Sequence, residues 1–408
     1  MRLMRARITA LLCLAAAVAL RPGSGQALAD AAKPPAGTKL PPQPREWVAP
    51  AVDLTPPPAP ARWSGGWTRG RDLPLPLAGH KAVAVGQRLY VVGGVTGRES
   101  LGSRDVLMTT VGKDGALGPW KKLSPLPTPV AFGAAVTARG RLYWLGGSSR
   151  EGMQLLYDKA WSAALKPDGT LSAWREERPL PDKLQHHAAA VLGDVLYVLG
   201  GFNGQEYNEA LRYAPLAADG TIGAWKDATG RYPHRVGRTS LQAAGGALYV
   251  TGGLWSDSQG EHITSLVRRG APGPDGDVKA WEDMGGLKIA SRSLRFSLAE
   301  EAGATDGAFV YAVGGRDPDA LGVPTVQASW LNPRKGVLTR WQNGPDLPLY
   351  GAKGAPQAAR VYESSAAIVG DRLVVLGGYL YVRELTPAVW VMALSPYAEP
   401  AWLKTRKP

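Results

Sequence analysis

Short runs of consecutive hydrophobic residues recur along the chain, and a Gly-Gly pair follows each run directly. The runs occupy 88–92, 141–145, 195–199, 247–251, 309–313 and 372–376, and the pairs are Gly93-Gly94, Gly146-Gly147, Gly200-Gly201, Gly252-Gly253, Gly314-Gly315 and Gly377-Gly378. Apolar residues without alternation are typical of a strand that is buried on both faces. The pattern therefore predicts six buried strands, each followed by backbone that glycine allows to turn or to approach a neighbour closely.

Polar turn residues separate these runs from their neighbours at regular places. A glycine at or near 86, 140, 193, 245 or 370 precedes most runs and predicts a tight turn from an earlier strand. Asp-Gly, the favoured two-residue hairpin turn, comes later in four units, at Asp114-Gly115, Asp168-Gly169, Asp219-Gly220 and Asp275-Gly276. A fifth unit keeps only Gly336. Each unit is thus expected to hold four antiparallel strands.

Tryptophan recurs in step with the units. The positions are Trp67, Trp120, Trp174, Trp225, Trp281, Trp341 and Trp402, spaced 53, 54, 51, 56, 60 and 61 residues apart. We expect each indole to lie on the fourth strand of its unit and to be buried between adjacent sheets, because a large aromatic side chain gains most from burial.

A period near 50 residues, with one Gly-Gly pair and one Trp per unit, resembles the kelch repeat. The resemblance covers roughly 340 of 408 residues and implies an all-β fold, a six-bladed β-propeller with four antiparallel strands per blade over residues 61–408. There are six Gly-Gly pairs but seven tryptophans in step with them. The outer strand of the last blade therefore comes either from the segment around Trp67 or from the segment around Trp402. We favour Trp67, since pairing the two ends of the repeat region closes the ring.

Composition agrees with this fold class. The chain has 51 Gly and 34 Pro, which excludes a helical bundle because both residues break helix interiors. Hydrophobic residues make up 45%, which excludes wholesale disorder. Cys13, the single cysteine, lies in an N-terminal segment that we expect to be removed. The mature chain would then have no cysteine, which excludes disulfide frameworks, thiolate metal sites and the cysteine-dependent copper site of the similar galactose oxidase.

The beginning of the chain is typical of an exported protein. Three early arginines, an apolar core at 8–20 and the sequence Ala27-Leu28-Ala29 predict a secretory signal peptide over residues 1–29. Residues 30–60 contain Pro34-Pro35 and Pro56-Pro57-Pro58 and are expected to form an extended spacer. We expect a periplasmic or extracellular protein without a transmembrane segment in the mature chain.

The net charge of the chain is positive, both with and without the predicted signal peptide. The net charge is +13, and removal of the four arginines of the signal leaves 43 basic residues against 34 acidic ones, or +9. This balance favours an anionic partner. We find no Lys/Arg block or nucleic-acid motif, and we expect no nucleic-acid partner.

Long loops are expected on one face of the propeller, and binding residues commonly reside on such loops. The candidate ligand-binding residues there are His80, His187, Arg238, Arg295, Arg316 and Glu363. Arginine offers a fork of donors to carboxylates and phosphates. His80 and His187 occupy equivalent places before an inner strand, where kelch repeats also use His or Arg for structural hydrogen bonds, so a structural role stays open for both.

The leading interpretation is an exported, monomeric, non-enzymatic propeller that binds a glycan or a protein through the long-loop face. We expect no metal or other cofactor and assign no catalytic residue, because the common catalytic motifs are missing. One alternative is a sugar-modifying enzyme similar to the bacterial sialic-acid epimerase, with Glu363 and Arg295 as possible acid/base and carboxylate-binding groups. A structural scaffold of the cell envelope is the other.

Overall fold

The computed structural model describes residues 62–97, 100–149, 155–257, 260–286, 302–316, 323–333, 335–339, 341–348, 361–380 and 384–397. The predicted signal peptide, the spacer and Trp402 lie outside these residues. All regular elements in the described part of the chain are β-strands, and it contains no helix long and apolar enough to cross a membrane.

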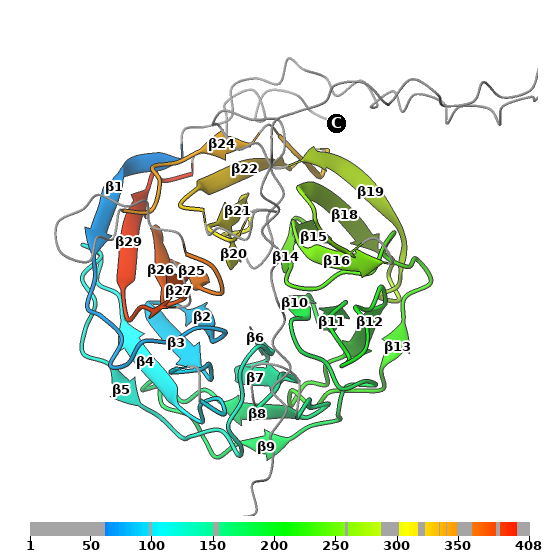
Figure 1. The fold of residues 1–408 in the computed structure, drawn as a ribbon, viewed down its shortest axis with the longest axis horizontal. Helices are drawn as coiled ribbons and strands as arrows, with labels where there is room; N and C mark the ends of the chain where they lie inside the picture. Colours follow the sequence, from blue (N-terminus) through cyan, green and yellow to red (C-terminus); the bar gives the residue numbers. More distant parts are fainter. Residues whose placement is uncertain are drawn as a thin grey trace, which may run out of the picture. The chain divides into compact units, whose positions relative to one another are not determined.

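Six sheets surround a central axis (Figure 1), which confirms the predicted six-bladed, all-β propeller. Each of blades 1 to 3 consists of four strands that are consecutive in the chain. Blade 1 consists of β2 (Lys81–Val85), β3 (Arg88–Val92), β4 (Val106–Thr110) and β5 (Lys121–Lys122), and blade 2 of β6 (Ala134–Ala138), β7 (Arg141–Leu145), β8 (Ala160–Ala164) and β9 (Arg175–Glu176). Blade 3 consists of β10 (Ala188–Leu192), β11 (Val195–Leu199), β12 (Leu211–Pro215) and β13 (Lys226–Asp227).

Blades 4 to 6 have longer or additional outer strands. Blade 4 consists of β14 (Ser240–Ala244), β15 (Ala247–Thr251), β18 (Leu266–Pro272) and β19 (Val278–Gly286). Blade 5 consists of β20 (Ala302–Thr305), β21 (Phe309–Val313), β22 (Val326–Asn332), β23 (Val337–Leu338) and β24 (Gln342–Asn343). Blade 6 consists of β25 (Ser365–Val369), β26 (Arg372–Leu376), β29 (Val389–Leu394) and β1 (Trp63–Arg69). The second strand of every blade is buried, as the apolar runs predict, and so are most residues of the third strands β4, β8 and β22.

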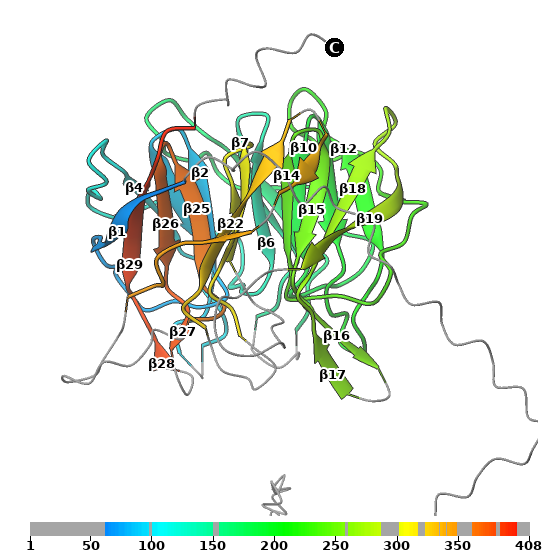
Figure 2. The same ribbon diagram turned by 90° about the horizontal axis from the view of Figure 1, so that it is seen from above.

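Two small hairpins extend the connections between the second and third strands. They are β16 (Leu254–Asp257) with β17 (Gly260–Ile263) in blade 4, and β27 (Tyr379–Leu380) with β28 (Glu384–Leu385) in blade 6. Figure 2 shows both hairpins projecting beyond the blades on the same side. This side, which also holds the connections from one blade to the next, is called the loop face below. The Asp-Gly turns lie on the opposite side, the turn face.

The ring is closed by the segment around Trp67. β1 pairs antiparallel with β29, with Trp67 opposite Met392 and Thr68 opposite Val391. The outer strand of blade 6 therefore comes from the beginning of the repeat region, and the favoured closure is confirmed.

The repeated tryptophans lie against the apolar clusters between neighbouring blades, but most of them are less deeply buried than the sequence predicts. Trp341 is buried, whereas Trp120, Trp174, Trp225 and Trp281 are partly buried. Trp120, Trp174 and Trp225 directly precede the two-residue strands β5, β9 and β13 at the rim, whereas Trp281 lies within the nine-residue β19. Trp120, Trp174 and Trp281 donate Nε1–H to a carbonyl about one repeat earlier in the chain, at Arg71, Ser124 and Gly230.

Hydrogen bonds on the turn face connect the blades. The tyrosine in the second strand of one blade donates its hydroxyl hydrogen to a glycine carbonyl in the next blade's turn, as in Tyr90 to Gly169 (2.9 Å), Tyr143 to Gly220 (2.6 Å), Tyr197 to Gly276 (2.9 Å) and Tyr249 to Gly336 (2.9 Å). In blades 1 to 4 the tyrosine hydroxyl of the second strand therefore links each blade to the next.

Candidate functional site

Five residues with left-handed backbone surround the axis on the loop face. Gly79, Phe132, His186, Arg238 and Glu363 have φ between +52° and +61°, and each stands two residues before an inner strand. Backbone hydrogen bonds of 2.7–3.0 Å join these residues in series. The N–H of Gly79 donates to the carbonyl of Glu363, that of Phe132 to Gly79, that of His186 to Phe132, and that of Arg238 to His186. A left-handed conformation is costly for a residue with a side chain and is found most often at functional sites.

Three of these side chains meet across the axis. Arg238 Nη1 donates to Glu363 Oε1 at 3.0 Å, and His186 Nδ1 lies 3.4 Å from the same oxygen. Arg238 Nε also donates to the Tyr207 hydroxyl at 3.2 Å. Blades 3, 4 and 6 supply the three, so the group bridges the mouth of the channel. We call His186, Arg238 and Glu363 the axial cluster.

The other side of the mouth is apolar. Phe132 is buried with Ala78, Val95 and Tyr379, and its ring lies 4.8 Å from the His186 ring between centroids. A Cβ on Gly79 would stand 2.4 Å from the Phe132 ring. Glycine at this position therefore makes room for the aromatic ring, and the mouth is half apolar and half charged.

Burial lowers the pKa of His186 well below its ordinary value, and the positive charges of Arg238, Lys81 and Arg316 lower it further. The imidazole is therefore neutral at pH 7. The uncharged His186 ring contacts the Glu363 carboxylate, and Arg238 supplies the positive charge of the ion pair with Glu363. Glu363 is only 8% exposed, so the ion pair is shielded from solvent on the carboxylate side.

The structure corrects the prediction for His80 and His187. Both are buried, at 0% and 2% exposure, and their rings pack on the first glycine of a Gly-Gly pair in the preceding blade, Gly377 and Gly146. Burial and the charge of Lys81 lower the pKa of each to about 3. Both are neutral residues packed between blades, and His187 also lines the central cavity beside the inner strands.

Of the other predicted residues, Arg238 and Glu363 do meet at the axis. Arg316 follows the Gly-Gly pair of blade 5, and its charge acts on His186. Arg295 lies outside the described residues. Sequence reasoning missed His186 and Tyr207. Neighbouring side chains on an extended chain point in opposite directions, so the choice between His186 and His187 required the position of the strand.

Aromatic side chains on the loop face, which could in principle stack on a sugar ring, pack against other protein side chains. Trp255 stacks on His262 at 4.1 Å between ring centroids, inside the β16–β17 hairpin. Tyr379 is 3% exposed and stacks on Tyr362. Tyr381 lies outside the described residues. These contacts leave the axial cluster as the stronger candidate site.

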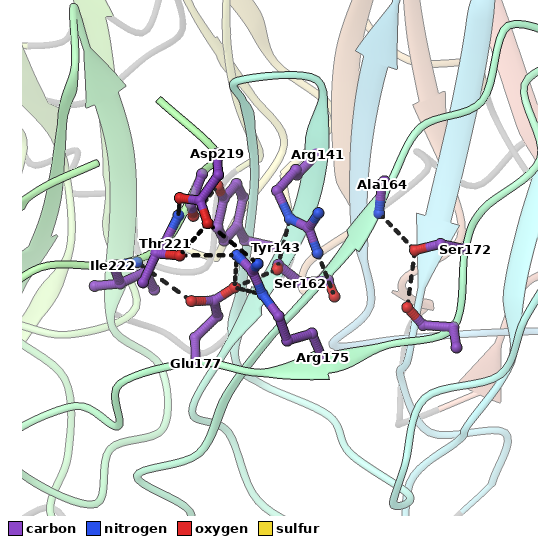
Figure 3. Close-up of polar contacts among 12 residues, drawn as sticks. Arg141, Tyr143, Ser162, Ala164, Ser172, Arg175, Glu177, Asp219, Thr221 and Ile222 are labelled. Carbon is purple, nitrogen blue, oxygen red and sulfur yellow. Dashed lines mark hydrogen bonds and ion pairs between the residues drawn. The ribbon is translucent and has the colours of Figure 1, made fainter. Parts of the chain in front are cut away.

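A second polar group lies between blades 2 and 3 (Figure 3). Glu177 accepts hydrogen bonds from Ser162 Oγ at 2.5 Å, from Arg175 Nε at 2.8 Å and from the Ile222 N–H at 3.2 Å. Burial and the Glu177 charge raise the pKa of Tyr143 to about 12. Ser162 is fully buried, so this group joins two blades and offers no reactive hydroxyl to a ligand.

The described residues contain no group of three or more His, Cys, Asp or Glu side chains arranged to hold a metal ion. The axial cluster can form charge-assisted hydrogen bonds, and its neutral imidazole and carboxylate are groups that can also exchange protons.

No family model matches the chain, but known proteins do. It is 36% identical over 124 residues to a kelch repeat-containing protein of Arabidopsis thaliana, a match covering 30% of this chain. It is 31% identical over 179 residues, or 40% of the chain, to Kelch repeat and BTB domain-containing protein 12 of Danio rerio, and 28% identical over 187 residues, or 46%, to Kelch-like protein 35 of Mus musculus. The matched segment spans 28% of each relative's length.

Two independent observations now agree. The repeat of Gly-Gly pairs and tryptophans folds into six four-stranded blades, and the similar proteins named above are kelch-repeat or kelch-like proteins. The chain is therefore a six-bladed β-propeller whose repeats are similar to those of kelch-repeat proteins.

Proposed function

We propose that this propeller is an exported, non-enzymatic module that binds a protein partner on its loop face. The observation that supports this most is the position of exposed leucines. Among the described residues, the large hydrophobic side chains that stand exposed are Leu75, Leu101 and Leu155, at 48%, 53% and 58%. All three lie on loops of the loop face. Exposed apolar groups beside charged ones are typical of protein-binding surfaces.

Electrostatics adds a preference for an acidic partner. Arg238, Lys81 and Arg316 all act on His186 at the mouth, and the whole chain carries a net charge of +13. A positive loop face would speed association with a negative partner, and this contribution would weaken as salt increases.

The mature protein is first used to capture partners from the extracytoplasmic fraction of its own source. Calorimetry then measures its affinity for the purified partner. The double variant L101D/L155D should bind at least ten times more weakly, because two exposed leucines of the loop face become charged. Ala116→Asp, exposed on the turn face, is the matched control and should bind normally. Equal affinity for all three proteins would exclude the loop face.

Export is tested on the same material. Mass spectrometry should find Asp30 at the N-terminus of the extracytoplasmic protein. An intact Met1 would contradict cleavage after Ala29.

A sugar-modifying enzyme is the second candidate, because Glu363, His186 and Arg238 meet at one mouth. A glycan array with bound sugars checked by NMR distinguishes the two functions. Chemical change of a sugar that is lost in Glu363→Gln would favour the enzyme, whereas binding without turnover would favour a glycan-binding module over either.

A further inference from the structure

The sequence Asn-Gly occurs twice in the chain, at Asn203-Gly204 and at Asn343-Gly344. It is the least hindered setting for the attack of a backbone nitrogen on the side-chain amide before it, because glycine has no Cβ in the way. The two copies have different surroundings. Asn203 is exposed in the β11–β12 connection on the loop face, whereas Asn343 belongs to strand β24.

In the β11–β12 loop the Asn203 side chain is folded back onto its own backbone. Its Oδ1 accepts hydrogen bonds from the N–H groups of Gln205 and Glu206, both at 2.9 Å. The ring closed by the first bond contains Asn203 Cγ and the Gly204 nitrogen, which keeps the two atoms that must join within one tight turn. Gly204 has φ of +100°, and its N–H makes no hydrogen bond among the described residues.

The two N–H donors also favour the reaction electrostatically. When the Gly204 nitrogen attacks Asn203 Cγ, negative charge develops on Oδ1. Donors that already point at this oxygen stabilise that charge, as the donors of an oxyanion hole do in acyl transfer. The loop therefore presents the attacking atom, the amide and the charge-stabilising groups together.

Asn343-Gly344 is protected by the sheet. The Gly344 N–H donates to the Val326 carbonyl at 2.7 Å, directly after the pairing of β24 with β22. A Cβ on Gly344 would stand 2.8 Å from the Trp63 ring, so the backbone is also packed closely. Attack by the Gly344 nitrogen first requires local opening of blade 5.

We propose that Asn203 is a site of spontaneous modification, at which the folded protein converts this asparagine into aspartate and isoaspartate. The Gly204 nitrogen forms a bond to Asn203 Cγ, and the Cγ–Nδ2 bond breaks. The proton of Gly204 passes through solvent to the leaving nitrogen, which departs as ammonia. Water then opens the cyclic imide at one of its two carbonyls. The net reaction consumes one water and yields one ammonium ion and one new carboxylate.

The modification changes the surface beside the axial cluster. The same loop carries Glu206, which pairs with Arg235, and Tyr207, whose hydroxyl accepts a hydrogen bond from Arg238. A carboxylate at Asn203 makes this part of the loop face more negative, and isoaspartate also lengthens the backbone by one methylene. The inference concerns the chemistry of the chain itself and does not depend on the proposed partner.

Peptide mapping by mass spectrometry of the folded protein, sampled during incubation at pH 7.5, tests the proposal. The peptide containing Asn203 should show the mass change of an amide-to-acid conversion and separate into two isomers. It should react at least ten times faster than the peptide containing Asn343, because Asn343 reacts only after local opening. Asn203→Gln, whose amide would have to close a larger ring, should remove the change.

The chain unfolded in guanidinium chloride is the control for the sequence motif. There the pairing around Asn343 is lost, so the two asparagines should react at similar rates. An unmodified Asn203 in the folded protein, or equal rates at the two asparagines there, would overturn the proposal. A tenfold difference that persists in the unfolded chain would come from the neighbouring sequence and would overturn the argument from the fold.

Discussion

At the scale of single residues, backbone conformation decides which side chains reach the axis. Phe132, His186, Arg238 and Glu363 adopt left-handed φ at equivalent places in four blades, and each then directs its side chain to the mouth. The following residue, His187 in blade 3, turns into the packing between blades. One peptide unit thus separates a candidate binding residue from a core residue.

The buried histidines make stability depend on pH. His80 and His187 have a pKa of about 3 in the folded protein, below the 6.5 of an unfolded chain, so their contribution is complete above pH 6.5 and is lost as the pH falls towards 3. Between pH 6.5 and 5 each should lose about 2 kcal/mol of unfolding free energy.

Urea unfolding at pH 7.5 and 5.0 measures this loss. His187→Gln cannot take up a proton, so the loss in this variant should be smaller than in the unchanged protein by about 2 kcal/mol. An identical loss in both proteins would mean that His187 is not held neutral.

At the scale of elements, the second strand of one blade is linked to the turn of the next. Burial raises the pKa of Tyr143 to about 12, which keeps its hydroxyl protonated as the donor to Gly220. In blade 6 the equivalent residue is Val374, and there Arg372 Nη2 donates to the Lys113 carbonyl across the interface at 2.5 Å. Different side chains therefore serve the same link between blades.

Tyr143→Phe should lower the unfolding free energy by about 1–2 kcal/mol, because the buried Gly220 carbonyl loses its donor. Tyr157→Phe is the control. Tyr157 is half-buried, and removal of its hydroxyl should change stability by less than about 0.5 kcal/mol. Chemical denaturation gives both values, and similar losses in the two variants would argue against the link.

At the scale of the whole molecule, the closure of the ring creates one interface unlike the others. Blade 6 takes its outer strand from the beginning of the repeat region, so it has no third-to-fourth-strand turn to accept the Tyr311 hydroxyl. Tyr311 donates instead to Asp306 at 2.9 Å. Arg62, just before β1, contacts the Tyr311 hydroxyl, the Asp306 carboxylate and the Ser395 carbonyl.

Arg62→Met should lower the unfolding free energy by about 3 kcal/mol, since the change leaves a shielded Asp306 carboxylate without its cation. Amide exchange should also accelerate in β1. Arg69→Met, at the other end of the same strand, breaks an exposed ion pair with Asp72 and should cost less than about 1 kcal/mol. Equal costs for the two variants would contradict a special role of Arg62 in closure.

The chain's periodicity by itself determined the number of blades, the buried second strands and the Asp-Gly turns, because each follows from local preferences that recur from one unit to the next. It also indicated that the segment around Trp67 closes the ring, because a closed ring needs the two ends of the repeat region to pair within one blade. The tertiary structure alone decided the site. Whether His186 or His187 faces the axis, and whether Glu363 reaches Arg238 two blades away, depends on strand placement and on contacts between residues more than a hundred positions apart. No local pattern in the sequence encodes those distances.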